Sequence, residues 1–347
     1  MSISFSGAVK YKKNNGFSLS QPIKKPLPSP IYIYNLKQGK NITLKPTVKK
    51  GEYILGGQKI ADLDTLEALP VFSAVSGTVS SLNDTSIVIE NDMLSRFVPR
   101  QKFDKPMNEL TSRELLWIIR ENGICESRTG TPVHVMLSPD TVPDCVIVCC
   151  FDSDPFVSSP QMAALNNTEK ILKGLDIVLN LLCTKKAIVA VENDTKKIFS
   201  DFKYHLRYNE DISLYSLKAR YPQSREDILI KTLTGKSSDS VNIPIFSPET
   251  LCAVADVFQS GRAVTTKIVT VSGDDILSPC NYSVPIGTPI SSLLSDSGYT
   301  SPKLVIQGGV LDGTPVTDLD EPVTISTTAI TAFNDTNNIL KYRKELV

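Results

Sequence analysis

The sequence has few residues of the kind that bind metals and no apolar run long enough to cross a membrane. Only two histidines, His134 and His205, occur among 347 residues, which argues against a histidine-rich metal site. Lysine plus arginine equals aspartate plus glutamate, at 37 each, so no net charge gathers nucleic acid or an anionic membrane. No stretch approaches the roughly 18 consecutive apolar residues that span a bilayer, and the N-terminus lacks a signal-peptide core. We therefore expect a cytoplasmic protein, without nucleic acid or direct membrane insertion, that reaches any membrane through a partner.

The seven cysteines follow neither a disulfide pattern nor a ligand pattern. Their number is odd and their spacing is scattered, which argues against a disulfide framework. Cys145, Cys149 and Cys150 lie in the apolar run VPDCVIVCCF, where buried structural thiols are the favoured interpretation. An iron–sulfur cluster needs three or four thiolates that converge from CxxCxxC-type loops. The sequence therefore predicts no bound iron–sulfur cluster and no metal site.

Residues 1–35 have the composition of an extended lead-in. Prolines at positions 22, 26, 28 and 30 exclude a helix there. Within this segment Tyr11 stands in the short basic stretch 10–13, beside Lys12 and Lys13. A solvated N-terminal arm explains that stretch best, so we expect its side chains to lie in water.

The most informative stretch is 48–79, within a β-module predicted for residues 36–105. Short apolar strands meet glycine turns at Gly51, Gly56 and Gly77, where positive φ is available at little cost. Another strand follows at 87–89. Several short strands at close spacing predict a small sandwich or barrel. The residues alone indicate no chemistry of its own for this module.

Residues 106–262 follow the pattern of an α/β domain. Asn108 or Thr111 can cap a helix over 108–122, with Glu114 at capping-box spacing from Thr111. The apolar run 145–151 is typical of a strand buried on both faces of a parallel sheet. Helices and strands then alternate, which predicts a Rossmann-like parallel sheet. The later segments are helices at 167–183, 195–204, 225–234 and 249–258 and strands at 187–192 and 212–217.

Residues 263–333 return to a β pattern, and residues 334–347 form a short polar tail. Two strands flank the turn at Gly273, a helix begins near Pro289, and a strand returns at 303–307. A hairpin, a helix and returning strands predict a β-grasp unit. The whole chain is thus expected to be multidomain, α/β plus β.

Several motifs, in this order, resemble two related electron-transfer subunits. KGEYILGGQ and SAVSGTV resemble the barrel-sandwich (lipoyl-like) domain of the Rnf complex C subunit and of the sodium-translocating NADH:quinone reductase A subunit. LTSRELLWIIRENGICESRTGTP resembles the quinone-reductase subunit in particular, whereas RYPQSREDILIKTLTG is closer to the Rnf subunit. TKIVTVSGDDILSPCNYSVPIGTPISSLL resembles their soluble-ligand-binding β-grasp domain. The resemblance covers roughly residues 30–332. Lipoyl carriers hold a modified lysine on the hairpin that corresponds to 64–72, and none is present here, which argues against a carrier role.

The resemblance also points to candidate cofactor-binding residues. Residues 123–132 correspond to a glycine-rich loop of the Rnf protein; Gly123 and Gly130 remain, and Glu126 places a charge that would repel a phosphate. Arg128 and Thr129 match an Arg-Thr pair of the quinone-reductase subunit. The arginine can fork onto an anionic ligand or pair with a nearby carboxylate.

Carboxylates follow two of the predicted parallel strands. Asp152 and Asp154 come after the first strand, and Glu192 ends the next one. Ligands of open α/β sheets bind at the carboxyl ends of strands. These side chains can hold a ribose hydroxyl or a cation, or they can cap turns. We predict no catalytic residue.

The resemblance implies a soluble subunit of an electron-transfer complex that docks redox partners, including membrane-bound ones, without an iron–sulfur cluster of its own. One alternative is an oxidoreductase subunit that binds NADH, FMN or a quinone. Another is a non-redox module that binds a small molecule through the β-grasp domain.

Overall fold

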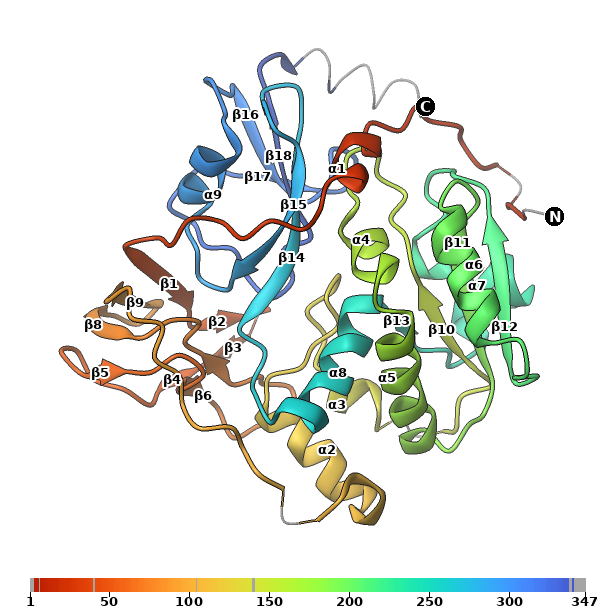
Figure 1. Cartoon of the computed structure of the whole chain (residues 1–347), viewed down its shortest axis with the longest axis horizontal. Coiled ribbons are helices and arrows are strands. Elements are labelled where there is room, and N and C mark those ends of the chain that lie inside the picture. Colours follow the sequence, from red (N-terminus) through yellow and green to blue (C-terminus); the bar gives the residue numbers. More distant parts are fainter. Residues whose placement is uncertain are drawn as a thin grey trace.

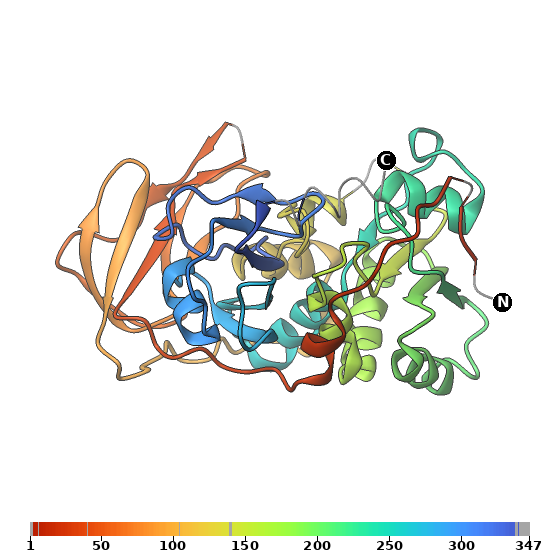
Figure 2. The same cartoon turned by 90° about the horizontal axis from the view of Figure 1, so that it is seen from above.

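The computed structural model describes residues 3–5, 7–39, 41–103, 105–138, 141–336 and 339 (Figure 1). A small β-module, an α/β domain and a second β-rich domain follow one another along the chain. Figure 2 shows the β-module at one end of the molecule and the α/β domain at the other. Within the described ranges no helix has the length and apolar character that a bilayer crossing requires.

The described residues of the N-terminal β-module form nine short strands. They are β1 (Ile31–Asn35), β2 (Lys37–Gln38), β3 (Ile42–Thr43), β4 (Lys45–Pro46), β5 (Tyr53–Ile54), β6 (Lys59–Asp62), β7 (Val71–Phe72), β8 (Gly77–Leu82) and β9 (Ser86–Asn91). An antiparallel sheet in the order β1-β9-β8-β5 and a second sheet in the order β4-β6-β7 share one apolar core. Gly51 has φ +83°, as its predicted turn requires.

The lead-in differs from the extended segment that the prolines predict. A single helical turn, α1 (Gly16–Ser20), precedes the first of those prolines, and β1 pairs with β9 as an edge of the module. The prolines exclude a helix only where they stand. Tyr32 and Tyr34 are buried in the core and alternate with residues that are more exposed, so this segment forms a strand although prolines precede it.

The central domain has the predicted parallel sheet. Its strands are β10 (Val146–Cys149), β11 (Ala187–Glu192), β12 (Ile212–Leu217) and β13 (Ile245–Phe246). The order is β12-β11-β10-β13, and every neighbouring pair is parallel. All four residues of β10 are buried, as the continuous apolar run predicts. The two-residue strand β13 carries too short a pattern to be recognised in the sequence.

Helices cover both faces of this sheet. They are α2 (Ser112–Glu121), α3 (Val133–Met136), α4 (Ser159–Leu165), α5 (Thr168–Leu181), α6 (Lys196–His205), α7 (Glu226–Thr234) and α8 (Pro248–Ser260), with 3₁₀ turns at Met107–Glu109 and Ser238–Ser240. The predicted capping box at Thr111 and Glu114 is present. The sequence did not indicate α3 or α4, because their one or two turns are too short for a clear apolar period.

The C-terminal domain is a mixed five-stranded sheet with one helix. Its elements are β14 (Thr266–Ser272), β15 (Cys280–Pro285), α9 (Ile290–Ser297), β16 (Leu304–Gln307), β17 (Thr314–Pro315) and β18 (Ala329–Phe333). The order is β15-β14-β18-β16-β17, with β14 parallel to β18. Leu293 and Leu294 of α9 lie in the apolar core against the sheet. Most of the predicted tail lies outside the described residues.

The contact between α5 and α8 depends on a glycine. A Cβ atom on Gly174 would lie 2.0 Å from the carbonyl oxygen of Leu251, which is backbone and cannot move aside. On a free helix surface, Gly→Ala stabilises. We expect Gly174→Ala to lower the free energy of unfolding by roughly 1–3 kcal/mol, as overpacking does. Urea unfolding measures it, with Lys173→Ala on the exposed side of α5 as the control. Unchanged or increased stability in Gly174→Ala would contradict this packing.

Candidate functional site

The four parallel strands end side by side, and we call this border of the sheet the carboxyl edge. Ligands of open α/β sheets bind there. Asp152 and Asp154 follow β10, and β11 ends on Glu192 with Asp194 two residues later. We call these four carboxylates the acidic edge. The parallel pairing of β10 with β11 therefore brings three of the predicted site residues together.

Asp154 holds the loop after β10 against the C-terminal domain. Its side chain accepts hydrogen bonds from the amide nitrogens of Phe156 (2.9 Å) and Leu311 (2.8 Å). Its own amide donates to Asp152 Oδ1 (2.9 Å), which is the turn-capping alternative weighed for these residues. Burial, followed by the charge of Asp152, raises the pKa of Asp154 to about 7. Burial also raises the pKa of Asp152, and Arg128 opposes that rise.

Glu192 is buried beneath a lysine from the beginning of the chain. Its Oε2 atom accepts from Lys13 Nζ and from Gln161 Nε2 (3.2 Å), and Lys13 also pairs with Asp194 at 2.8 Å. Oε1 of Glu192 has no hydrogen-bond partner among the described residues. Burial raises the pKa of Glu192 to about 7, and the charge of Lys13 offsets only part of this effect.

The N-terminal arm, the described residues 3–5 and 7–15, crosses the carboxyl edge. The amide of Ile3 donates to Ser216 O (3.0 Å), Val9 and Tyr221 exchange two backbone hydrogen bonds, and the amide of Asn14 donates to Pro155 O (2.8 Å). Figure 2 shows the arm running from α1 along the α/β domain. It therefore joins the end of β12 to the loop after β10.

Tyr11 places its ring within this crossing. The hydroxyl is buried and has no hydrogen-bond partner in the described part of the chain. Burial raises the pKa of Tyr11, and the acidic edge adds to the shift. The expectation that Tyr11 and Lys13 lie in water is therefore wrong. Lys12, between them, does remain exposed.

Arg128 reaches the same edge from the loop after α2. Its guanidinium donates to Ser224 O (3.2 Å), and its Nε lies 3.8 Å from Glu126 Oε1. Nε has no hydrogen-bond partner among the described residues. This geometry is compatible with both interpretations of Arg128, binding of an anionic ligand and pairing with a carboxylate. Glu126 lies near the guanidinium, and the Nε donor is unused among the described residues.

Glu126, the loop residue whose charge would repel a phosphate, lies at the N-terminus of α8. Its carboxylate is buried and accepts from the amide of Ser247 (3.0 Å), the residue that caps the N-terminus of α8. A helix N-terminus attracts anions, and here a side chain of the chain itself takes that place.

The remaining predicted residues lie elsewhere. Gly123, Thr129 and Gly130 line a cavity of about 490 Å³ between the N-terminal module and the C-terminal domain. Gly123 and Gly130 both have positive φ, at +68° and +74°. The seven predicted residues thus divide into a group at the carboxyl edge and a group at this cavity.

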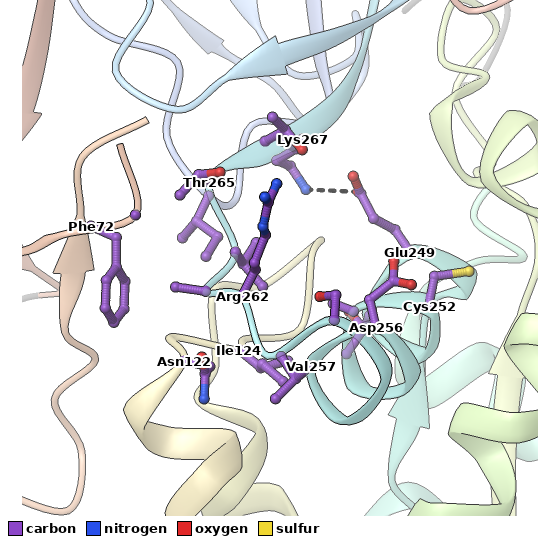
Figure 3. A pocket seen from close by; sticks show the side chains of 18 of the residues that line it. Phe72, Asn122, Ile124, Glu249, Cys252, Asp256, Val257, Arg262, Thr265 and Lys267 are labelled. Carbon is purple, nitrogen blue, oxygen red and sulfur yellow. Dashed lines mark hydrogen bonds and ion pairs between the residues drawn. The ribbon is translucent and has the colours of Figure 1, made fainter. Parts of the chain in front are cut away.

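A larger cavity, of about 750 Å³, lies along α8 where the three domains meet (Figure 3). Lys267 is buried in its wall and donates to Ser127 O (2.8 Å) and to Glu249 Oε2 (3.2 Å). Arg262 extends across the cavity and stacks over Phe97, 5.6 Å from the ring centre. The sequence singled out none of these side chains, because they come from segments far apart in the chain.

Sequence reasoning also missed the roles of Tyr11, Lys13 and Gln161. The only available signal was the basic stretch 10–13 in a chain whose parallel strands end in acidic residues. Charge complementarity could have linked the two, but nothing in the spacing shows that the arm folds back.

The raised pKa values predict that stability depends on pH. A carboxyl whose pKa rises on folding stabilises the fold below its unfolded pKa, and this contribution is lost as pH rises through the folded value. Asp154 moves from 3.8 to about 7 and Glu192 from 4.5 to about 7. We expect the melting temperature to fall between about pH 4 and pH 8.

Asp154→Asn should flatten this fall, because asparagine has no proton to lose. The exposed Asp176→Asn is the matched control and should keep the wild-type profile. Thermal melts across this pH range measure both. Parallel profiles for Asp154→Asn and the wild type would show that Asp154 does not titrate as described.

Two family models match consecutive parts of the chain. Residues 3–99 match the RnfC barrel sandwich hybrid domain, and residues 119–259 match the Nuo51 FMN-binding domain. The parallel sheet of the central domain, within mixed α/β structure, agrees with the match of residues 119–259 to the FMN-binding domain. Chains of an NAD⁺-reducing [NiFe]-hydrogenase share the fold, with a TM-score of 0.55 and 18% identity over 67% of this chain and 49% of the other.

Curated relatives extend the similarity across the domains. The C subunit of the proton-translocating ferredoxin:NAD(+) oxidoreductase complex of Clostridium ljungdahlii is 28% identical over 96% of this chain and 78% of its own length. The C subunit of the ion-translocating oxidoreductase complex of Haemophilus influenzae is 28% identical over 92% of this chain, which spans only 42% of that relative. The likeness to the quinone-reductase A subunit stays a prediction. Over most of its length the chain is similar to the C subunits of ion-translocating oxidoreductase complexes, and its N-terminal part matches the RnfC barrel sandwich hybrid domain.

Proposed function

We propose that the chain is a soluble subunit of an electron-transfer complex of the Rnf kind, in which it docks redox partners. The observation that carries this proposal is the similarity to C subunits over 92% to 96% of the chain, across all three domains. Those relatives are named as subunits of ion-translocating complexes. By analogy, this chain would work on the cytoplasmic side and meet the membrane through its partners.

Docking is favoured over cofactor chemistry at the carboxyl edge. FMN carries a phosphate, and phosphates bind where backbone N–H groups and cations are free. Here Ser247 caps the N-terminus of α8 and its amide already donates to Glu126, and the N-terminal arm and four carboxylates fill the edge. These residues do not fit FMN in the conformation described, so we derive no reaction step through it.

The finer architecture supports the same proposal. We assign the central domain as Rossmann-like and the C-terminal domain as β-grasp, from the parallel order of β10 to β13 and the hairpin, helix and returning strands of β14 to β18. The domain boundaries near residues 106, 263 and 334 remain part of this proposal. We propose the start of β1 at Ile31 as the first boundary, because β1 pairs with β9 of the module.

A second candidate function is binding of NADH or FMN in redox chemistry. It is favoured by the match of residues 119–259 to an FMN-binding domain. The cavity along α8, with Arg262 and Phe97 in its wall, offers a cation and an aromatic ring to a flat anionic molecule outside the carboxyl edge. A quinone, or a non-redox ligand of the C-terminal domain, has no such specific support.

Co-purification tests the docking proposal. The chain, tagged at its natural locus and isolated after mild crosslinking, should carry subunits of an oxidoreductase complex in fixed proportion. Mass spectrometry identifies them, and an unrelated tagged protein of similar size and abundance is the control. A chain that is always recovered alone would contradict a role in such a complex.

Absorbance and titration test the cofactor alternative and the predicted lack of a cluster. The docking proposal expects purified protein without flavin or iron–sulfur absorbance and without saturable change on titration with NADH, FMN or a short-chain quinone. Saturable flavin binding that Arg262→Ala abolishes and Arg225→Ala retains would favour the second candidate. Arg225 is a suitable control because it lies on the surface, paired with Asp227.

A further inference from the structure

The N-terminal arm occupies the place where a doubly wound sheet binds its ligand. It is tied by backbone hydrogen bonds at Ile3, Val9 and Asn14, and these anchor points lie on both sides of the acidic edge. Between them, Tyr11 and Lys13 point into the edge and Lys12 is exposed. A segment in water would show neither the repeated anchoring nor this alternation.

Charge explains which occupant the edge accepts. The acidic edge gathers four carboxylates, and Asp312 adds negative charge beside Asp152 and Asp154. Lys13 pairs with Glu192 and Asp194, and the charge of Arg128 acts on Asp152. Without Lys13, Glu192 and Asp194 would have no ion-pair partner among the described residues. A phosphate would add negative charge to the acidic edge, whereas an ammonium is attracted by it. The site therefore favours a cation, which the ammonium of Lys13 supplies, and the ring of Tyr11 lies beside it.

We infer that the carboxyl edge of this chain is a docking site for its own N-terminal arm, held by the buried Lys13–Glu192 ion pair, and that the docked arm excludes the phosphate of FMN. The arm thus replaces the cofactor that the matched FMN-binding domain would suggest. This inference concerns the chain by itself and does not depend on membership in any complex.

Removal of one partner from a buried ion pair leaves the other charge uncompensated, which is strongly destabilising. Local opening of the arm should therefore increase in Lys13→Ala. We expect hydrogen exchange at the amides of Val9 and Asn14 to accelerate at least about tenfold. Lys12→Ala is the matched control, one residue away and exposed, and should leave these rates unchanged.

Amides of β14 and β15 serve as the internal standard for a folded chain. The expected result is faster exchange in the arm alone. Equal rates of hydrogen exchange at the amides of the arm in Lys13→Ala and Lys12→Ala would overturn the inference, because Lys13 would then not hold the arm.

The wild-type full-length chain gives a second test that needs no variant. Reductive methylation followed by mass spectrometry compares the two lysines, and the side chain of Lys13 is 16% exposed and ion-paired. We expect Lys13 to react at least about tenfold more slowly than Lys12. Similar rates at both lysines would overturn the inference even if Lys13→Ala failed to fold.

The same labelling reports on FMN. If the docked arm excludes the phosphate, FMN added in large excess should leave the rate at Lys13 unchanged. Faster labelling of Lys13 with FMN, and not with riboflavin, would show that the phosphate displaces the arm, and the inference would fall. If co-purification found no partner subunits, these labelling rates would still be as expected. The proposed function and the docking of the arm are therefore tested independently.

Discussion

Burial of an ionised carboxylate costs several kcal/mol unless opposite charge and hydrogen bonds compensate it. The parallel sheet of this chain ends in Asp152, Asp154 and Glu192, of which Asp154 and Glu192 are buried and Asp152 is half-buried. Compensation comes from far along the sequence. Leu311 of the C-terminal domain donates to Asp154, and Lys13 of the N-terminal arm pairs with Glu192. The need to satisfy these carboxylates therefore ties both ends of the chain to the central sheet.

The same constraint changes what the central domain can bind. Its match to an FMN-binding domain and the shared fold of a hydrogenase chain describe a scaffold. Function depends on the groups placed on a scaffold. Here the helix N-terminus at Ser247 receives the carboxylate of Glu126, and the carboxyl edge receives Tyr11 and Lys13. Side chains of the protein itself thus occupy both the amide of Ser247 and the carboxyl edge.

Much of the fold could be predicted because its signals are local. The apolar run 145–151 predicts a strand buried on both faces. The capping box at Thr111 predicts the start of α2, and glycines predict the ends of α7 and α8. Elements with short patterns escaped prediction, as β13 and α4 did. Of the candidate site, the acidic residues could be placed at the carboxyl edge from strand order alone. Gly123, Thr129 and Gly130 could not, because their cavity is formed by walls from other domains.

The sequence by itself determined the order of the domains, the parallel sheet and the carboxylates at the strand ends, since each follows from a pattern within a few neighbouring residues. Only the tertiary structure decided what those carboxylates meet. The segment 10–13 has the composition of a solvated arm, and the side chain of Lys12 is exposed as that composition predicts. The side chain of Lys13 is instead ion-paired, because the chain folds back onto Glu192. That residue lies 179 positions away in the sequence, too far for any local pattern to indicate the contact.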